Sequence, residues 1–192
     1  MSGMTEDFAA ARRTMVVSQL RPEGVTDVAV LAAMAKVPRE DHVPDVLRPM
    51  AYMDRSQLID GAPMMAPAEL GRLLSEIAPE IGERALVIGG GGEYSAAILA
   101  SIGLTVDRSA SLHERLTGHY DVILIEGAVP EIPAALVDRL SGTGRIGAAI
   151  LDRGVARLSI GRRNGQHVGF RSVADAQVPL LPGSVPDPSF QF

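Results

Sequence analysis

The sequence predicts an α/β fold with a doubly wound, mostly parallel sheet. The first observation is the run ALVIGGGGEY at residues 85–94, an apolar strand that leads directly into a glycine-rich turn. The second is the alternation of apolar runs with helical patterns, because such alternation places successive strands in parallel. The third is a pair of strand patterns near the C-terminus, joined by Asn164-Gly165, which indicates an antiparallel hairpin at one edge.

Residues 1–55 are predicted to form a helical N-terminal layer. Thr5 or Asp7 is suited to cap a first helix, because a short polar side chain accepts hydrogen bonds from unpaired N–H groups at a helix start. Thr26 is the expected cap of a second helix. Pro38 should end that helix, since the residue before a proline is driven out of helical geometry.

Residues 56–180 are predicted to form the core of the same domain. Pro67 suits the first position of a helix, and a further helix is expected from Pro133 to a closing glycine, Gly142. Apolar runs typical of buried strands occur at residues 85–88, 104–107, 121–125 and 145–151. Residues 181–192 are rich in proline and are predicted to form an extended tail.

The short stretch after the second strand limits the size of the sheet. Only residues 108–120 separate the second strand from the third, and a crossover needs about 10–12 residues. One short helix near residues 110–116 fits there, but an additional strand does not. The sheet is therefore predicted to be shortened by one strand–helix unit and smaller than a full six- or seven-stranded sheet. Because an exposed edge strand invites pairing, we also expect a homodimer.

Length and composition favour one globular domain over residues 1–192. The 46% hydrophobic and 21% charged content is that of a globular protein, and the net charge of -5 argues against nucleic acid or an anionic membrane as a partner. The chain contains no cysteine and neither a secretory signal nor an apolar run of about 18 residues, so we expect a cytoplasmic protein. The four histidines show no metal-ligand spacing, so no metal site is predicted.

The four glycines after the first strand are the candidate binding residues: Gly89, Gly90, Gly91 and Gly92. In doubly wound domains this turn lets a nucleotide-like cofactor touch the backbone, although tight packing alone can also require glycine. A dinucleotide fingerprint is not met, because Tyr94 stands where its third glycine belongs. Glu126 follows a buried strand at its carboxyl end, and its side chain is expected to contact a ligand, cap a helix or face solvent.

Most of the chain, from Met15 to Leu180, resembles the protein-L-isoaspartate O-methyltransferase family. The stretch MVVSQLRPEGVTDVAVLAAMAKVPREDHVP follows the family pattern M-V-x-x-Q-x-x-x-x-G-I-x-D-x-x-V-L-x-A-M-x-x-V-P-R-x-x-F-V-P. Further matches are AYxD at residues 51–54, YDVI at 120–123, IPxxL at 132–136 and VPL at 178–180. The residues in register within the first stretch are Gln19, Gly24, Asp27, Leu31, Met34, Pro38, Arg39 and Pro44.

The resemblance implies a Rossmann-like methyltransferase fold with S-adenosylmethionine as cofactor. The family methylates the carboxyl group of isoaspartyl residues in damaged proteins, which is a repair reaction. The cofactor residues that the resemblance implies are the four glycines, Glu93 and Asp107. Asp107 either supplies the ribose-binding acid or ends the following strand, if the shortening removed the earlier one.

This sequence departs from the family at the residues that carry the chemistry. The family's loop reads G-Q-T-I-S-x-P, whereas residues 61–67 read GAPMMAP, so Met65 stands in place of the active-site serine. A thioether cannot donate a hydrogen bond, so no catalytic residue is assigned, and Met64 and Met65 are interpreted as apolar filler. In the cofactor loop, Val87 replaces an acid and Glu93 replaces a glycine.

Two functions are therefore predicted from the sequence. The first is carboxyl methyl transfer from S-adenosylmethionine to isoaspartyl residues, which depends mainly on positioning. The alternative is a catalytically inactive, methyltransferase-like protein that binds a protein or peptide partner in the old substrate groove.

Overall fold

The computed structural model describes residues 7–114 and 117–185 and contains a six-stranded sheet in the order β4-β3-β5-β6-β7-β8. Its strands are β3 (Arg84–Ile88), β4 (Thr105–Ser109), β5 (Tyr120–Val129), β6 (Leu140–Asp152), β7 (Val155–Asn164) and β8 (His167–Ala176). A separate two-stranded ribbon pairs β1 (Gln57–Ile59) with β2 (Ala62–Met64). The α-helices are α1 (Phe8–Met15), α2 (Val28–Lys36), α3 (Pro67–Ile77), α4 (Glu93–Ile102) and α5 (Ala134–Val137).

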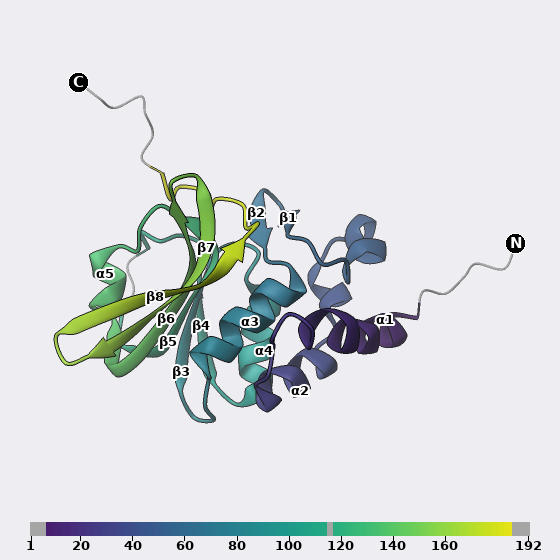
Figure 1. The fold of residues 1–192 in the computed structure, drawn as a ribbon, viewed down its shortest axis with the longest axis horizontal. Coiled ribbons are helices and arrows are strands. Elements are labelled where there is room, and N and C mark those ends of the chain that lie inside the picture. The colour runs from purple at the N-terminus through teal and green to yellow at the C-terminus, as the bar shows by residue number, and fades with distance from the viewer. Residues whose placement is uncertain (1–6, 115–116, 186–192) are drawn as a thin grey trace, which may run out of the picture.

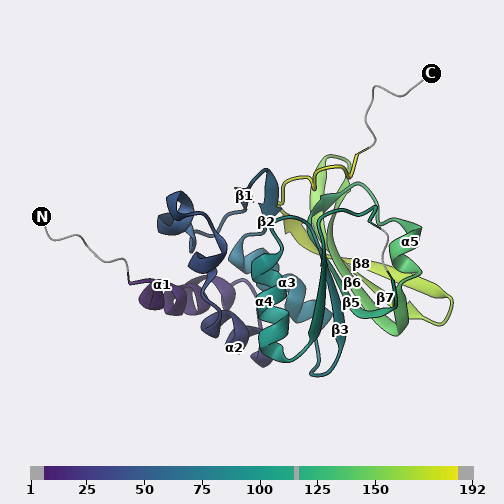
Figure 2. The ribbon, with the colours of Figure 1, turned by 180° about the vertical axis from the view of Figure 1, so that it is seen from behind.

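The helices form layers on the sheet. Figures 1 and 2 show α3 and α4 against one face, α1 and α2 outside them, and α5 on the opposite face. A large apolar cluster fills the first side, and a smaller one lies beneath α5. This arrangement confirms the predicted α/β class with a helical N-terminal layer. No helix among the described residues is long and apolar enough to cross a membrane.

The cap residues of the N-terminal layer follow from side-chain geometry. Asp7 accepts a hydrogen bond from the Ala10 N–H at 2.9 Å, as expected for a cap of α1. The prediction of Thr26 as the cap of α2 is wrong, because Asp27 accepts from the Val30 N–H at 2.9 Å instead. A cap bonds the N–H three residues ahead, so a helix that begins at Val28 uses the residue directly before it.

The parallel part of the sheet has its shortened edge at β4. The strands β4, β3, β5 and β6 pair in parallel, and β7 pairs antiparallel with both of its neighbours. The six strands are those that the sequence predicts, four parallel ones and two in the C-terminal hairpin, so the sheet is smaller than a seven-stranded one but not smaller than a six-stranded one. The missing strand–helix unit agrees with β4 as the last strand at that edge. The predicted homodimer stays a prediction.

Two predicted helices differ from the structure. The helix expected between Pro133 and Gly142 ends at Val137, because Leu140 already pairs with Tyr120 in the sheet. The apolar stripe that suggested a longer helix is therefore divided between α5 and β6. Residues 110–114 form turns and bends, and the last two residues of the short helix expected there lie outside the described residues.

The C-terminal hairpin is confirmed, with its turn one residue later than expected. Asn164 pairs with His167, so the turn residues are Gly165, at φ +63°, and Gln166. After β8, the Leu181 N–H donates to the Ala128 carbonyl at 2.8 Å and its side chain is buried on the α5 face. Residues 186–192 of the predicted tail lie outside the described residues.

Candidate cofactor and substrate site

The glycine turn lies at the point where the strand order reverses. It joins β3 to α4, and β3 pairs with β4 on one side and with β5 on the other. Gly89 has a φ of +126°, and a Cβ there would lie 2.8 Å from the Glu126 carbonyl oxygen. Ligands of doubly wound sheets bind at such a crevice, outside the carboxyl ends of the strands. The fold therefore places the turn where the sequence predicts a cofactor.

A second segment covers this turn in the structure. Residues 61–66, called here the covering segment, contain β2, end directly before α3 and lie across the glycines. A Cβ on Gly90 would lie 2.8 Å from the Ala62 Cβ, and one on Gly91 would lie 2.6 Å from the Pro63 carbonyl carbon. Met64 and Met65 are both 0% exposed. Their predicted role as apolar filler agrees with this burial.

Two charged side chains hold the backbone of Met65. The Met65 N–H donates to Glu126 Oε1 at 2.7 Å, and its carbonyl accepts from Arg39 Nη2 at 2.7 Å. Glu126 Oε2 also accepts from the Ser95 hydroxyl, on the first turn of α4. Arg39 Nε donates to the Ala51 carbonyl at 2.8 Å. Glu126 and Arg39 therefore both hold the covering segment by hydrogen bonds to the backbone of Met65.

The covering segment lies over two ionisable side chains that are shielded from solvent. Glu126 and Arg39 are both 0% exposed. Burial raises the pKa of Glu126 and lowers the pKa of Arg39, because both charged forms lose their hydration. The Arg39 guanidinium also lies 4.9 Å from the centre of the buried Tyr94 ring. Within the described part of the chain, Arg39 Nη1 and Tyr94 Oη have no hydrogen-bond partner.

These positions answer what the sequence left open for Glu126. Its side chain neither caps a helix nor faces solvent but holds the covering segment. Arg39 was visible in the sequence only as part of the family pattern. Nothing local predicts its burial, because its partners are Ala51, Met65 and Tyr94, all distant in sequence or across the fold.

The other predicted cofactor residues lie in surface ion pairs. Glu93 opens α4, and its carboxylate lies 3.0 Å from Arg108 Nη1. Asp107 lies 2.5 Å from Arg84 Nη2 and accepts from the Tyr120 hydroxyl at 3.1 Å. Asp107 therefore belongs to the strand beside β3, two residues before its end. The cofactor roles of these two acids and of the four glycines stay predictions.

The covered turn has no room for S-adenosylmethionine in this conformation. The cofactor would need to touch backbone where Pro63 lies, and Gly91 and Gly92 are buried. The residues present therefore do not fit the cofactor while the covering segment lies on the turn. The described residues contain no group of three acids or histidines able to hold a metal ion. The His42 ring lies beside the Tyr94 ring, with centres 5.7 Å apart and planes tilted by 55°.

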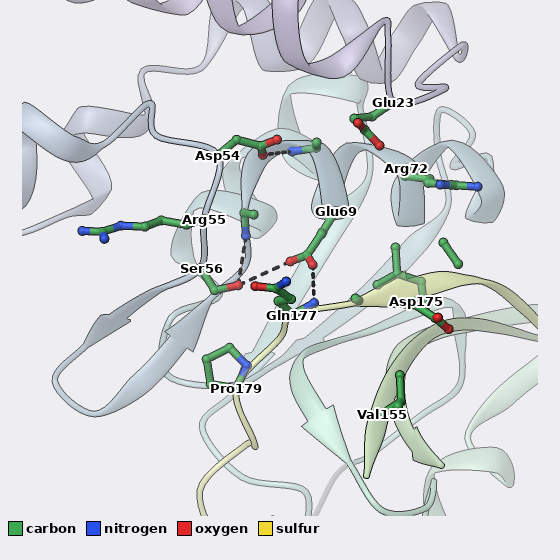
Figure 3. Close-up of a pocket in the computed structure, with 15 residues that line it drawn as sticks. Glu23, Asp54, Arg55, Ser56, Glu69, Arg72, Val155, Asp175, Gln177 and Pro179 are labelled. Atoms are coloured by element: carbon green, nitrogen blue, oxygen red, sulfur yellow. Dashed lines mark hydrogen bonds between the residues drawn. The ribbon is translucent and has the colours of Figure 1, made fainter. Parts of the chain in front are cut away.

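An open cavity of about 670 Å³ lies on the other side of the covering segment, bounded there by Ala66 (Figure 3). Glu69 stands in its centre, accepting from the Gln177 N–H at 2.6 Å and from the Ser56 hydroxyl at 3.4 Å. Partial burial raises the pKa of Glu69. The other charged lining residues are Glu23, Asp54, Arg55, Arg72 and Asp175. This cavity has the size of a ligand site and carries charges of both signs.

The fold is that of the S-adenosylmethionine-dependent methyltransferases. A solved protein-L-isoaspartate O-methyltransferase superposes with a TM-score of 0.74 at 17% identity, covering 90% of this chain and 66% of that one. A putative protein-L-isoaspartate O-methyltransferase from Plasmodium falciparum, solved with S-adenosyl-L-homocysteine, gives a TM-score of 0.72 at 16% identity, covering 88% of this chain and 97% of that one. These likenesses establish the fold.

The chain belongs to the protein-L-isoaspartate O-methyltransferase family. The family model described as Protein-L-isoaspartate(D-aspartate) O-methyltransferase matches residues 11–117. The relative named Protein-L-isoaspartate O-methyltransferase 1, from Rhodopseudomonas palustris, is 30% identical over 206 residues, covering 91% of this chain and 84% of the relative. Another, from Methylorubrum extorquens, is 36% identical over 168 residues, covering 73% and 74%. The resemblance found in the sequence is thereby confirmed.

Proposed function

We propose that this chain transfers a methyl group from S-adenosylmethionine to the carboxyl group of isoaspartyl residues in proteins. The observation that carries this proposal is the family match, which spans both the N-terminal layer and the glycine turn. The relatives from Rhodopseudomonas palustris and Methylorubrum extorquens bear the name of this activity.

The proposed entry for the isoaspartyl peptide is the cavity of Figure 3. It lies next to Met65, the position of the family's serine, because Ala66 forms part of its wall. Arg72 lines the cavity and makes one long contact there, to the Val173 carbonyl at 3.4 Å. A guanidinium so placed is suited to bind a substrate carboxylate. Without the serine hydroxyl, this reaction depends on positioning of the two substrates.

Cofactor binding is the decisive test of this proposal, because the covering segment must first leave the turn. Thermal unfolding is measured with and without millimolar S-adenosylmethionine or S-adenosylhomocysteine. A ligand at about 100 times its Kd stabilises the fold by about 2.7 kcal/mol, so an upward shift of several degrees is expected. Methyl transfer to an isoaspartyl peptide then tests the chemistry, with the matching aspartyl peptide as control. Absence of both signals contradicts the proposal.

A second candidate is a non-catalytic protein that binds a peptide in the same cavity. The observation in its favour is the covered glycine turn together with Met65 at the serine position. This candidate predicts that an isoaspartyl or other peptide binds with the same affinity in the presence and absence of S-adenosylhomocysteine. Methyl transfer above the rate of the peptide and cofactor without protein rejects it.

A further inference from the structure

The buried carboxyl group of Glu126 and the buried guanidinium of Arg39 hold the two peptide groups of Met65 from opposite sides. Glu126 accepts from the Met65 N–H and Arg39 donates to the Met65 carbonyl, each at 2.7 Å. A buried polar or charged group is costly unless it is hydrogen-bonded, so each group is stabilised by the presence of the covering segment. We infer that Glu126 and Arg39 form a clamp that holds the covering segment closed over the glycine turn, and that opening of the clamp admits S-adenosylmethionine. The second half rests on the proposed function.

The clamp also joins the covering segment to the turn itself. The second oxygen of Glu126 accepts from Ser95, which lies in the first turn of α4, directly after the glycines. One carboxylate therefore contacts both sides of the crevice that a cofactor must enter. Loss of this carboxylate releases the covering segment and the start of α4 together.

Two of the buried polar atoms that lack a hydrogen-bond partner in the described part of the chain belong to Arg39 of the clamp and to Tyr94, whose ring the Arg39 guanidinium faces. Arg39 Nη1 and Tyr94 Oη have no partner among the described residues, and both side chains are 0% exposed. An unpaired buried donor weakens the state that contains it. The closed state is therefore less stable than one in which both atoms have partners, and this lowers the free-energy cost of opening.

A single introduced thiol measures how often the clamp opens. The chain contains no cysteine, so Met65→Cys places a unique thiol at a fully buried position. Its alkylation rate is compared in the Met65→Cys protein and after adding Glu126→Gln or Glu126→Ala. We expect a rise of at least tenfold with Glu126→Ala and a smaller rise with Glu126→Gln, whose amide oxygen still accepts from residue 65.

Val129→Ala is the matched control for this measurement. Val129 lies on the same strand as Glu126 and is also 0% exposed, but it packs on the α5 face. It should change the alkylation rate less than twofold. Equal rates in the Glu126 variants and the parent overturn the clamp, and so does an equal rise with Val129→Ala.

A disulfide tests the contact without removing any member of the clamp. Ala62→Cys with Gly90→Cys places two thiols where the Ala62 Cβ lies 2.8 Å from a Cβ built on Gly90, close enough to join after a small shift. Oxidation should cross-link this pair nearly completely, whereas failure to cross-link overturns the closed position. Each single cysteine variant serves as the control.

S-adenosylhomocysteine binding to the cross-linked protein separates the two proposals. We expect calorimetry to detect binding in the reduced protein and at least tenfold weaker binding in the oxidised one. Equal binding in both forms overturns the gating role of the clamp and leaves the proposed function standing. Binding in neither form contradicts the proposed function and the admission of cofactor, while the alkylation rates still decide whether Glu126 holds the segment closed.

Discussion

The charged side chains on the two sides of the covering segment differ in how deeply they are buried. On the glycine-turn side, Glu126 and Arg39 are fully buried and bonded to the backbone. On the cavity side, Glu69 and Arg72 are half-buried and border open space. The covering segment thus lies on the glycine turn, and its last residue, Ala66, also lines the cavity. The glycine turn, where a cofactor is predicted, is therefore covered by hydrogen-bonded and packed residues, whereas the cavity is open to solvent.

Among the variants that test this comparison, removal of the Glu126 side chain should lower the free energy of unfolding the most. Glu126→Ala leaves the Met65 N–H and Ser95 hydroxyl without an acceptor and Arg39 without its buried counter-charge. We expect the free energy of unfolding to fall by about 3–5 kcal/mol, as when a buried ion loses its partner. Urea denaturation measures the change, and Glu69→Ala, across the segment, should cost about 1 kcal/mol. Equal losses at the two positions would contradict the comparison.

A methyl group on the glycine turn should also destabilise the closed side. Gly91→Ala places a Cβ against the Pro63 backbone, which has to move away. We expect a loss of about 1–3 kcal/mol, as in other overpacked sites. Gly142→Ala is the control, since its Cβ meets no atom within 4 Å and its change should stay within about 0.5 kcal/mol. Thermal unfolding of both variants distinguishes a covered turn from an open one, for which Gly91→Ala would be as mild as Gly142→Ala.

The pH dependence of stability should report the buried carboxylate. The pKa of Glu126 is raised in the folded state by burial, so the folded chain keeps this proton after the unfolded chain, with a pKa of about 4.3, has lost it. The stabilisation that the Glu126 carboxyl group gives the folded state is therefore fully present below about pH 4.3. It is lost as the pH rises through the pKa of this group in the folded chain. Glu126→Gln should flatten this decline in urea titrations at several pH values. An unchanged slope would indicate that the carboxylate is hydrated.

The smallest effect on stability is expected at Arg72, on the open side. Arg72→Met keeps the aliphatic stem and removes only a long contact to Val173, so the free energy of unfolding should change by less than about 0.5 kcal/mol. If the cavity binds the substrate carboxylate, KM for an isoaspartyl peptide should rise about tenfold with little change in kcat. A KM unchanged by the substitution would place the peptide elsewhere.

Local signals in the sequence predicted much of the scaffold. Pro67 begins α3, and the strand before the glycine turn is β3, because proline geometry and apolar runs act over a few residues. The errors occur where two local patterns compete. Leu140 fits a helical stripe with Leu136, but sheet pairing with Tyr120 assigns it to β6. Tertiary pairing overrides periodicity there.

The candidate site was only half predictable for a similar reason. The glycine turn and the substitution at Met65 are visible in the sequence, since both are departures within a known pattern. The burial of Glu126 is not visible, because an acid at the end of an apolar strand suits a ligand site, a cap or the surface equally well. Its acceptor role depends on Met65, 61 positions earlier in the chain.

By itself, the sequence determined the order of the elements, the place of the glycine turn and the family of this protein. These depend on local backbone preferences and on a long residue pattern, which need no knowledge of contacts. Only the tertiary structure decided that residues 61–66 lie on the turn and that Arg39 and Glu126 hold them there. Such contacts arise when α3 and α4 pack on one face of the sheet. That packing brings together segments that are distant in sequence, and no local pattern in either segment indicates the contact.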